Sequence, residues 1–399
     1  IMVTAKEAEY EDAQEEVKEA SEEEYLSLEQ RTTLGRELFN AFRKLDLLQE
    51  FLEDDDVTEI MINGTQAIFY EKGGRLYQSD KRFLSKDKLE DVIQQIVAGS
   101  NRLVNEASPI VDARLSDGSR VNVVLAPIAL NGPIVTIRKF AREGITMQNL
   151  IAWQSIDQKT ATYLTTLVAA GYNIFISGGT GSGKTTFLNA LSSYIPETER
   201  VITIEDSAEL QITQVPNLVR LETRGANAEG EGAVEISDLI RASLRMRPNY
   251  LIVGEVRGKE CLDMLQALNT GHFGLSTGHG NSARDMLSRL ETMTLMAADL
   301  PLPAVRGQIA SAIDILVHLG RLRDRSRRVL EIMEVTGFSD GEIQLNPLYR
   351  FMERRDADEE KERGEPEKCG KSRALQRSGK GRVSGTLVRV GNLKNREKL

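Results

Sequence analysis

The hydrophobic positions in the first third of the chain change from a helical period to a strand period. Over residues 31–53 they recur every three or four positions and predict an amphipathic helix: Leu34, Leu38, Phe42, Leu45 and Leu48. Over residues 57–80 and 110–140 the apolar runs are short and are separated by turn pairs such as Asn-Gly and Asp-Gly, with a helix expected near 85–99. This pattern predicts a small α+β domain of mostly antiparallel hairpins over residues 31–140.

A linker is expected at residues 141–147, and beyond it strands and helices alternate. Short apolar strands are expected at residues 173–177, 201–204 and 251–253, each followed by glycine or acidic residues. This alternation favours an α/β domain with a parallel sheet and helices on its faces, here over residues 148–349. Open sheets of this class bind ligands just past the carboxyl ends of their strands, so the residues that follow these strands are the functional candidates.

Charge is distributed unevenly along the chain. The net charge of −9 over 399 residues argues against a protein that coats nucleic acid through overall basicity. Residues 1–30 are strongly acidic, and segment 350–399, where the hydrophobic period stops, ends in a basic run that begins at Lys368. Terminal runs of one charge are usually solvated, so both ends are predicted to be disordered.

Cysteine usage and hydropathy point to the cytoplasm. Cys261 and Cys369 are the two cysteines, too few for a disulfide framework or a zinc site, which fits a reducing compartment. No apolar run approaches the roughly 18 residues that a membrane-spanning helix needs. We therefore expect a cytoplasmic protein whose association with a membrane would require a partner.

A phosphate-binding loop follows the first apolar strand. Its residues match G-x-x-x-x-G-K-[ST] and lead into an apolar helix: Gly178, Gly179, Thr180, Gly181, Ser182, Gly183, Lys184 and Thr185, with Thr186 next. Glycines let successive backbone N–H groups wrap a phosphate, and the N-terminus of the following helix favours the same anion. Lys184 is expected on the β- and γ-phosphates and the Thr185 hydroxyl on Mg²⁺. ATP and Mg²⁺ are therefore the expected ligands.

Carboxylates follow the other two strands. Glu255 ends the strand at 251–253, where many P-loop enzymes carry an acid directed at Mg²⁺, and a glutamate there can orient or deprotonate the attacking water. Glu205, with Asp206 and Glu209, follows the strand at 201–204; such a cluster suits Mg²⁺ or water, although alone it is more often a solvated loop. Glu205 and Glu255 are the candidate catalytic and metal-binding acids.

The histidines divide into a glycine-rich pair and a core residue. His272 and His279 lie seven positions apart in segment 270–281. With no third ligand nearby in the sequence, a metal pair is disfavoured, and a loop that senses the γ-phosphate is favoured because histidine can hydrogen-bond phosphate. His318 falls in the apolar run 313–319 and is predicted to be a core residue.

With these segments in order, residues 45–345 resemble the secretion ATPases of type II and type IV secretion systems and of pilus assembly. Among these, the chain is most similar to the CpaF-like branch, which drives tight-adherence (Flp) pili. The resemblance rests on segments 117–122 and 137–140 of the N-terminal domain, the Walker A loop 178–185, the aspartate box 203–210, the Walker B strand 252–257 and the histidine box 270–279. One departure is the histidine box, which is one residue shorter than usual between His272 and Ser276.

The resemblance implies an ATP-hydrolysing motor. Its fold would be a RecA-like P-loop domain preceded by a smaller, PAS-like α+β domain. It also implies a homo-hexameric ring that is peripheral to the inner face of the cell membrane, docks on a polytopic platform protein and acts indirectly on pilin subunits. It further implies that His279, Arg120 and Arg138 contribute to the nucleotide site, and that Arg220 and Arg224 complete the site of a neighbouring subunit.

Two other functions stay open. A nucleic-acid motor of the same broad fold is favoured only by the basic tail, because the rest of the chain offers no basic groove studded with aromatic residues. No nucleic-acid partner is therefore expected, and DNA-stimulated ATPase activity would contradict this. A nucleotide-binding scaffold without turnover is opposed by the intact set of Lys184, Thr185 and Glu255, unless the short histidine box disables the ring.

Overall fold

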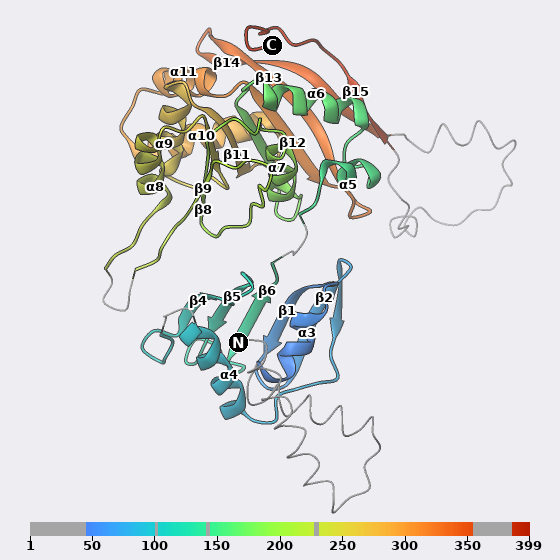
Figure 1. Ribbon diagram of the computed structural model, residues 1–399, viewed down its shortest axis with the longest axis vertical. Helices are drawn as coiled ribbons and strands as arrows, with labels where there is room; N and C mark the ends of the chain where they lie inside the picture. Colours follow the sequence, from blue (N-terminus) through green and yellow to red (C-terminus); the bar gives the residue numbers. More distant parts are fainter. Residues whose placement is uncertain (1–44, 100–102, 141–143, 227–230, 354–384) are drawn as a thin grey trace, which may run out of the picture. The chain divides into compact units, whose positions relative to one another are not determined.

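The computed structural model describes residues 45–99, 103–140, 144–226, 231–353 and 385–399 (Figure 1). The chain divides into two compact units between residues 143 and 144, inside the segment expected to be a linker. The acidic segment 1–30 and most of the helix predicted over residues 31–53 lie outside the described residues. None of the described helices is long and apolar enough to cross a bilayer.

The N-terminal unit is an antiparallel sheet with helices packed on it. Its six strands lie in the order β3-β2-β1-β6-β5-β4. They are β1 (Val57–Asn63), β2 (Ala67–Lys72), β3 (Arg75–Gln78), β4 (Ile110–Arg114), β5 (Arg120–Val124) and β6 (Ile134–Arg138). Helix α4 (Lys86–Gly99) buries one stripe of its surface in the core of this unit: Leu89, Val92, Ile93, Ile96 and Val97. The α+β hairpin architecture expected from the sequence is therefore found.

The predicted helix over residues 31–53 is not continuous where it is described. A 3₁₀ turn, η1 (Asp46–Leu48), precedes a short helix, α3 (Gln49–Glu53). Asp46 has φ of +52°, a left-handed conformation that an uninterrupted α-helix does not contain. Leu48 and Leu52 are nevertheless buried against the sheet, so the hydrophobic period identified the correct face of this segment.

The second unit is built on a nine-stranded mixed sheet in the order β15-β14-β13-β12-β7-β11-β10-β8-β9. The strands are β7 (Ile174–Gly178), β8 (Val201–Glu205), β9 (Leu218–Glu222), β10 (Tyr250–Val253), β11 (Phe273–His279), β12 (Ile315–Arg321), β13 (Arg327–Ser339), β14 (Glu342–Glu353) and β15 (Gly385–Arg389). Six neighbouring strands of the sheet, β12, β7, β11, β10, β8 and β9, are parallel. In contrast, β13 pairs antiparallel with both β12 and β14. The expected parallel sheet thus has an antiparallel extension, because the short turns that join these last strands reverse the chain.

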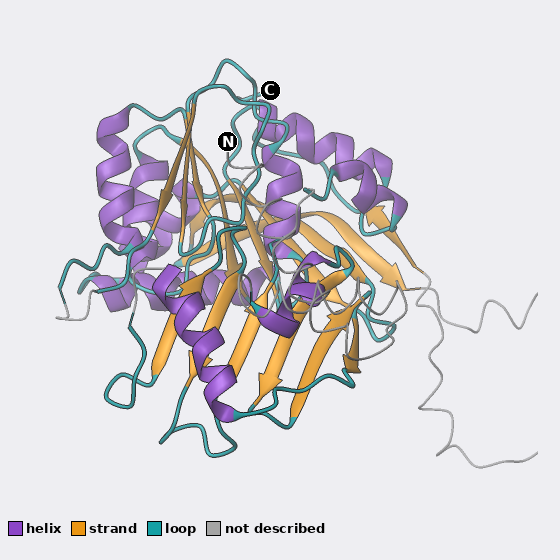
Figure 2. Ribbon diagram, turned by 60° about the horizontal axis from the view of Figure 1, so that its bottom comes forward, coloured by secondary structure: helices purple, strands orange, loops and turns teal. Residues whose placement is uncertain are grey.

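Helices cover both faces of this sheet, as the layers in Figure 2 show. Alternate residues of β7 point into two hydrophobic cores, one on each face of the sheet: Ile174 and Ile176 pack with one set of helices, and Phe175 packs with the other. The first set is α5 (Met147–Ala152), α6 (Gln158–Ala169) and α7 (Lys184–Ser192). The second is α8 (Ile236–Ser243) with the 3₁₀ turn η2 (Leu244–Met246), α9 (Glu260–Asn269), α10 (Ala283–Ala297) and α11 (Leu302–Ala312). This doubly covered sheet is the architecture that the alternating pattern predicts.

The prediction that residues 350–399 lack structure is wrong for both ends of that segment. Strand β14 continues to Glu353, and β15 pairs antiparallel with it, from Tyr349↔Arg389 to Glu353↔Gly385. Leu393 is buried in the core shared with α5–α7. A five-residue edge strand depends on pairing with a distant part of the chain, which local hydrophobic periodicity does not reveal. Residues 354–384 lie outside the described residues.

Candidate functional site

Two positions in the loop from Gly178 to Lys184 favour glycine: Gly178 and Gly183. A Cβ on Gly178 would lie 2.5 Å from the Ser182 Oγ and 2.6 Å from the Leu319 carbonyl oxygen, so no side chain fits there. Gly183, the N-cap residue of α7, has φ of +92°, in the region that residues with side chains rarely adopt. The loop therefore has the strand–loop–helix geometry in which backbone N–H groups surround a phosphate.

Lys184 begins α7 and is only 8% exposed. Its Nζ lies 3.3 Å from the Gly179 carbonyl oxygen and 3.3 Å from His279 Nδ1, and 3.9 Å from Glu255 Oε1. Burial lowers the pKa of Lys184, the Glu255 charge raises it, and the Arg257 charge lowers it further. An anion bound in the loop would offset this burial of a cation.

Glu255 is held between three nitrogen-bearing side chains. Its Oε2 accepts hydrogen bonds from Arg257 Nη2 at 2.5 Å and Nε at 2.8 Å. Its Oε1 is buried and lies 3.0 Å from His279 Nε2, at ion-pair distance but without hydrogen-bond geometry. The backbone beneath it is fixed because the Thr277 hydroxyl donates to the Gly254 carbonyl. One carboxylate oxygen is thus anchored, and the other faces Lys184 and His279 without a hydrogen bond.

Glu205 and its acidic neighbours do not form one cluster with a single role. Glu205 is 3% exposed, and its Oε2 accepts hydrogen bonds from the backbone N–H groups of Glu209 and Leu210, at 2.7 and 3.0 Å. Burial raises the pKa of Glu205, which those two N–H groups and the Arg220 charge partly offset. Asp206 is exposed, with Oδ2 3.6 Å from Arg257 Nη1. The Glu205 side chain therefore holds the turn after β8 in shape, while its Oε1 makes no hydrogen bond.

The residues around the loop fit a magnesium ion bound together with a nucleotide. Thr185, and next to it Thr186, lie in the first turn of α7, and no residue in the described part of the chain hydrogen-bonds the Thr185 hydroxyl. Three or more His, Cys, Asp or Glu side chains do not come together as a metal site anywhere in the described ranges. A hydroxyl, a nearby carboxylate and phosphate oxygens are the hard ligands that Mg²⁺ takes in such sites.

The histidine box is not the loop that the sequence suggested, and a role in sensing phosphate stays a prediction. Residues 273–279 form strand β11, and the two histidines lie at its opposite ends. His272 Nδ1 lies 3.0 Å from the Ala267 carbonyl oxygen, at the C-terminal end of α9. Only His279, at the carboxyl end of the strand, reaches the P-loop. Since a strand of seven residues spans roughly 23 Å, His272 is too far away to contact the same phosphate.

His318 is a buried core residue, as predicted. Its Nδ1 lies 2.9 Å from the Ser177 Oγ, in the strand that ends at the P-loop.

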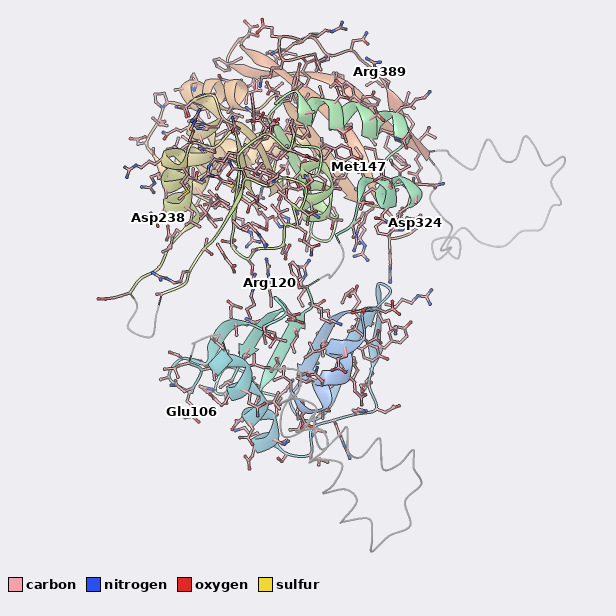
Figure 3. The ribbon with its side chains drawn as sticks, viewed as in Figure 1. Glu106, Arg120, Met147, Asp238, Asp324 and Arg389 are labelled. Atoms are coloured by element: carbon pink, nitrogen blue, oxygen red, sulfur yellow. The ribbon has the colours of Figure 1, made fainter. Side chains whose placement is uncertain are left out.

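The arginines that the resemblance implicates lie on three strands and one loop. Arg220 is exposed on β9, the edge strand, and its charge acts on Glu205 of the same chain. Arg224 follows β9, and its Nε donates to the Gly232 carbonyl at 2.9 Å. Arg120 and Arg138 belong to the N-terminal unit and lie directly opposite each other across β5 and β6; Arg120 is labelled in Figure 3. Their roles toward a nucleotide stay predictions.

Three basic residues near the loop were not among the candidates. Arg257 anchors Glu255, as described above. Arg327 Nε donates to the Gly181 carbonyl at 2.9 Å, and Arg321 Nη1 would lie 3.8 Å from a Cβ on Gly181. The sequence feature that could have identified Arg321 and Arg327 is the arginine-rich stretch at residues 321–328. Because this stretch lies more than 130 positions from the loop in the sequence, its proximity to the loop could not be predicted.

Comparison with known proteins agrees with this architecture. The family described as Type II/IV secretion system protein matches residues 43–395. A putative conjugal transfer protein of Mycobacterium tuberculosis is 33% identical over 310 residues, which cover 76% of this chain and 87% of that protein. The type IV secretion system protein PtlH of Bordetella pertussis is 33% identical over 323 residues, covering 72% of this chain and 93% of that protein.

Solved structures share the fold. The Legionella pneumophila ATPase DotB matches with a TM-score of 0.52 and 23% identity, covering 72% of this chain and 79% of that chain. The pilus retraction motor PilT with bound ADP matches with a TM-score of 0.53 and 20% identity, covering 76% and 81%. An ATPase was the enzyme class expected from the sequence, and the DotB structure carries that description. The match to most of the chain, together with relatives 33% identical over three quarters of it, shows that this protein belongs to the type II/IV secretion system protein family.

Proposed function

We propose that this chain is an ATP-hydrolysing motor, with the reaction centred on Glu255. The observation that carries the proposal is the position of this carboxylate at the carboxyl end of β10, with Oε1 3.9 Å from the P-loop lysine and Oε2 anchored by Arg257. A purely structural carboxylate would be expected to satisfy both oxygens. The unbonded Oε1 is instead suited to a water molecule and its proton.

In the proposed hydrolysis, different residues of the chain bind the phosphates and activate the water. Backbone N–H groups of the loop and Lys184 bind the phosphates, and Glu255 orients the water that attacks the γ-phosphorus and accepts its proton as the bond to the leaving ADP oxygen breaks. His279 stays neutral near pH 7, because burial and the Lys184 charge lower its pKa from 6.5, so it can donate a hydrogen bond to phosphate without adding charge. Bound Mg²⁺ would neutralise charge on the phosphate oxygens, with Thr185 among its ligands.

Glu205 fits a supporting position better than a second general base. One of its oxygens is occupied by two backbone N–H groups, and a Cβ on Gly254 would come within 3.0 Å of its Cγ. It packs beside the backbone that carries Glu255, and its unbonded oxygen remains a candidate ligand for Mg²⁺ or its water.

The biological task that we infer is pilus assembly or protein secretion. In this proposal the chain belongs to the CpaF-like branch, forms a hexameric ring with ATP bound in each subunit, and works at the inner face of the cell membrane on a polytopic platform protein. The six matched motifs support this branch. Conjugal transfer is a second candidate, since relatives 33% identical carry that name. Stimulation of ATPase activity by DNA would favour transfer, whereas co-purification with a platform protein and no effect of DNA would favour pilus assembly.

The decisive experiment compares two site variants with two surface controls. Lys184→Ala should lose nucleotide affinity and turnover together. Glu255→Gln should keep ATP binding and lose hydrolysis by about 10²-fold or more, because glutamine cannot accept the proton. The exposed Lys159 and Glu197, which make no polar contact within the described ranges, provide Lys159→Ala and Glu197→Gln as matched controls.

Phosphate release and nucleotide binding are both measured for all four variants. Near-normal turnover in Lys184→Ala would refute the P-loop assignment. Lost ATP binding in Glu255→Gln would make Glu255 a structural or metal-binding residue instead.

A further inference from the structure

Two arginines face each other across the hairpin that joins β12 to β13. Arg321 ends β12 and Arg327 begins β13, and they are directly paired in the antiparallel register. The turn between them contains Asp324, which is labelled in Figure 3. Like charges directly opposite each other destabilise an antiparallel pair. Both residues are exposed, so solvent screens most of this repulsion, and an anion bound beside them would reduce what remains.

Both arginines lie against the phosphate-binding loop. Arg327 Nε donates to the Gly181 carbonyl at 2.9 Å, and its Cδ would lie 3.4 Å from a Cβ on Gly183. Arg321 Nη1 would lie 3.8 Å from a Cβ on Gly181. The strands explain this position: β12 is hydrogen-bonded to β7 in parallel register up to Leu319↔Gly178, so β12 emerges beside the loop at the same edge of the sheet.

Neither arginine has a negative partner within the described ranges. The Arg321 side chain makes no polar contact there, and the Gly181 carbonyl is the only polar contact of the Arg327 side chain in those ranges. Two other arginines of the same hairpin have side-chain partners: Arg323 pairs with Glu353, and Arg328 donates to the Gln154 carbonyl and lies over the Phe351 ring. Arg325, in the turn, has no side-chain partner in the described ranges, but no contact places it at the loop. Among the arginines of this hairpin, Arg321 and Arg327 are the two that lie against the loop, and neither has a counter-charge in the described ranges.

We propose that Arg321 and Arg327 form a second phosphate-binding element, which contacts the phosphate chain of the nucleotide held by the P-loop and increases affinity for di- and triphosphates. The inference rests on the proposed binding of ATP. A phosphate chain would supply the missing negative charge to both arginines, and a guanidinium can donate two parallel hydrogen bonds to phosphate oxygens. The backbone N–H groups of the loop would bind the nucleotide from one side and the hairpin from another.

The test measures binding of ADP to Arg321→Gln, Arg327→Gln and the double variant by titration calorimetry. Arg323→Gln is the matched control, since this arginine lies on the same hairpin but is paired with Glu353. Each single variant should bind ADP about 10-fold more weakly and the double variant on the order of 100-fold, whereas the control should stay within about twofold. Pyrophosphate, used as a competitor, should show the same order of effects, and adenosine should show none.

Thermal melting without ligand separates a nucleotide contact from a structural one. Because the Arg321 side chain touches no polar group in the described residues, Arg321→Gln should melt at or above the wild-type temperature without ADP and gain less stabilisation from ADP. A lower melting temperature without ligand would assign Arg321 a structural role and overturn its part of the proposal.

Three results would overturn the inference as a whole. If the double variant binds ADP within about twofold of wild type, the two arginines do not contact the phosphates, although the proposal that the wild-type protein binds and hydrolyses ATP would be unaffected. Equal loss of adenosine and ADP affinity would show that the hairpin contacts the nucleoside and not the phosphates. If wild-type protein and Lys184→Ala bind ADP equally weakly, the P-loop assignment and the inference fail together.

Discussion

At the scale of single residues, the pair formed by Ser177 and His318 links core packing to the P-loop strand. The imidazole is 7% exposed, and its Nδ1 lies 2.9 Å from the Ser177 Oγ. Burial lowers the pKa of His318 from 6.5, although the Glu331 and Asp285 charges act in the opposite direction. The folded state therefore holds the neutral ring, and the unfolded chain takes up a proton first as the pH falls.

This residue predicts a specific pH dependence of stability. Above about pH 6.5 both states are neutral at His318 and nothing changes, whereas below it the unfolded state gains a proton and stability is lost. His318→Asn keeps a hydrogen-bonding group and cannot titrate. Between roughly pH 7.5 and 5.5, the free energy of unfolding of this variant should therefore fall less than that of wild type, by up to about 1 kcal/mol. Urea unfolding at several pH values measures this, and parallel curves for the two proteins would contradict it.

At the scale of elements, one buried acid, Glu334 of β13, adds to the strand pairing and core packing that hold the C-terminal segment. Glu334 is 1% exposed, and it accepts hydrogen bonds from the Lys394 and Asn395 backbone N–H groups and from the Asn346 side chain, at 2.6–3.0 Å. The Tyr172 hydroxyl donates to the Asn395 carbonyl at 2.8 Å. These bonds position residues that follow β15 on the ATPase unit.

Replacing this acid should weaken the attachment of the segment. Glu334→Gln should destabilise the ATPase unit by about 2–4 kcal/mol, because the amide loses the charge and presents an N–H group to donors. Glu331→Gln is the control: that residue pairs with Arg350 at 3.5 Å near the surface, and its loss should cost about 0–1 kcal/mol. In a chain that ends before residue 385, Glu334→Gln should have little further effect. Additive losses of stability would show that Glu334 does not act through this segment.

At the scale of the whole molecule, the proposed ring predicts that an arginine of one subunit completes the site of the next. Arg224 is the sharper candidate, because the charge of Arg220 already acts on Glu205 within one chain. A guanidinium inserted beside the γ-phosphate stabilises charge that develops during hydrolysis. Arg224→Ala should therefore lose turnover, and mixing with Lys184→Ala subunits, whose arginines are intact, should restore part of it.

The control for this mixing experiment is Arg245→Ala, an exposed arginine in η2 that should keep near-normal turnover. Activity equal to the sum of the two separate variants, in rings shown to contain both, would exclude a role in the neighbouring site.

Much of the ATPase unit was predictable, because local signals identify it. The apolar strands, the glycine pattern at residues 178–185 and the acid at Glu255 each depend on adjacent residues, and all three are found at one edge of the sheet. The histidine box was misread for a physical reason. Glycine and small polar residues at 274–278 suggest a loop, yet this segment is a buried central strand whose small side chains let neighbouring groups approach: a Cβ on Gly274 would lie 2.2 Å from Leu268 Cδ2.

The sequence alone determined the order of elements, the phosphate loop and the family resemblance, since these follow from hydrophobic period and from residues close together in the chain. Only the tertiary structure decided which distant groups meet: His279 with Glu255, Arg321 and Arg327 with the loop, and Glu334 with the C-terminal segment. Side chains far apart in sequence come together through strand order and register, which depend on pairing between segments separated by many residues. Local composition does not predict which strands pair or in which register.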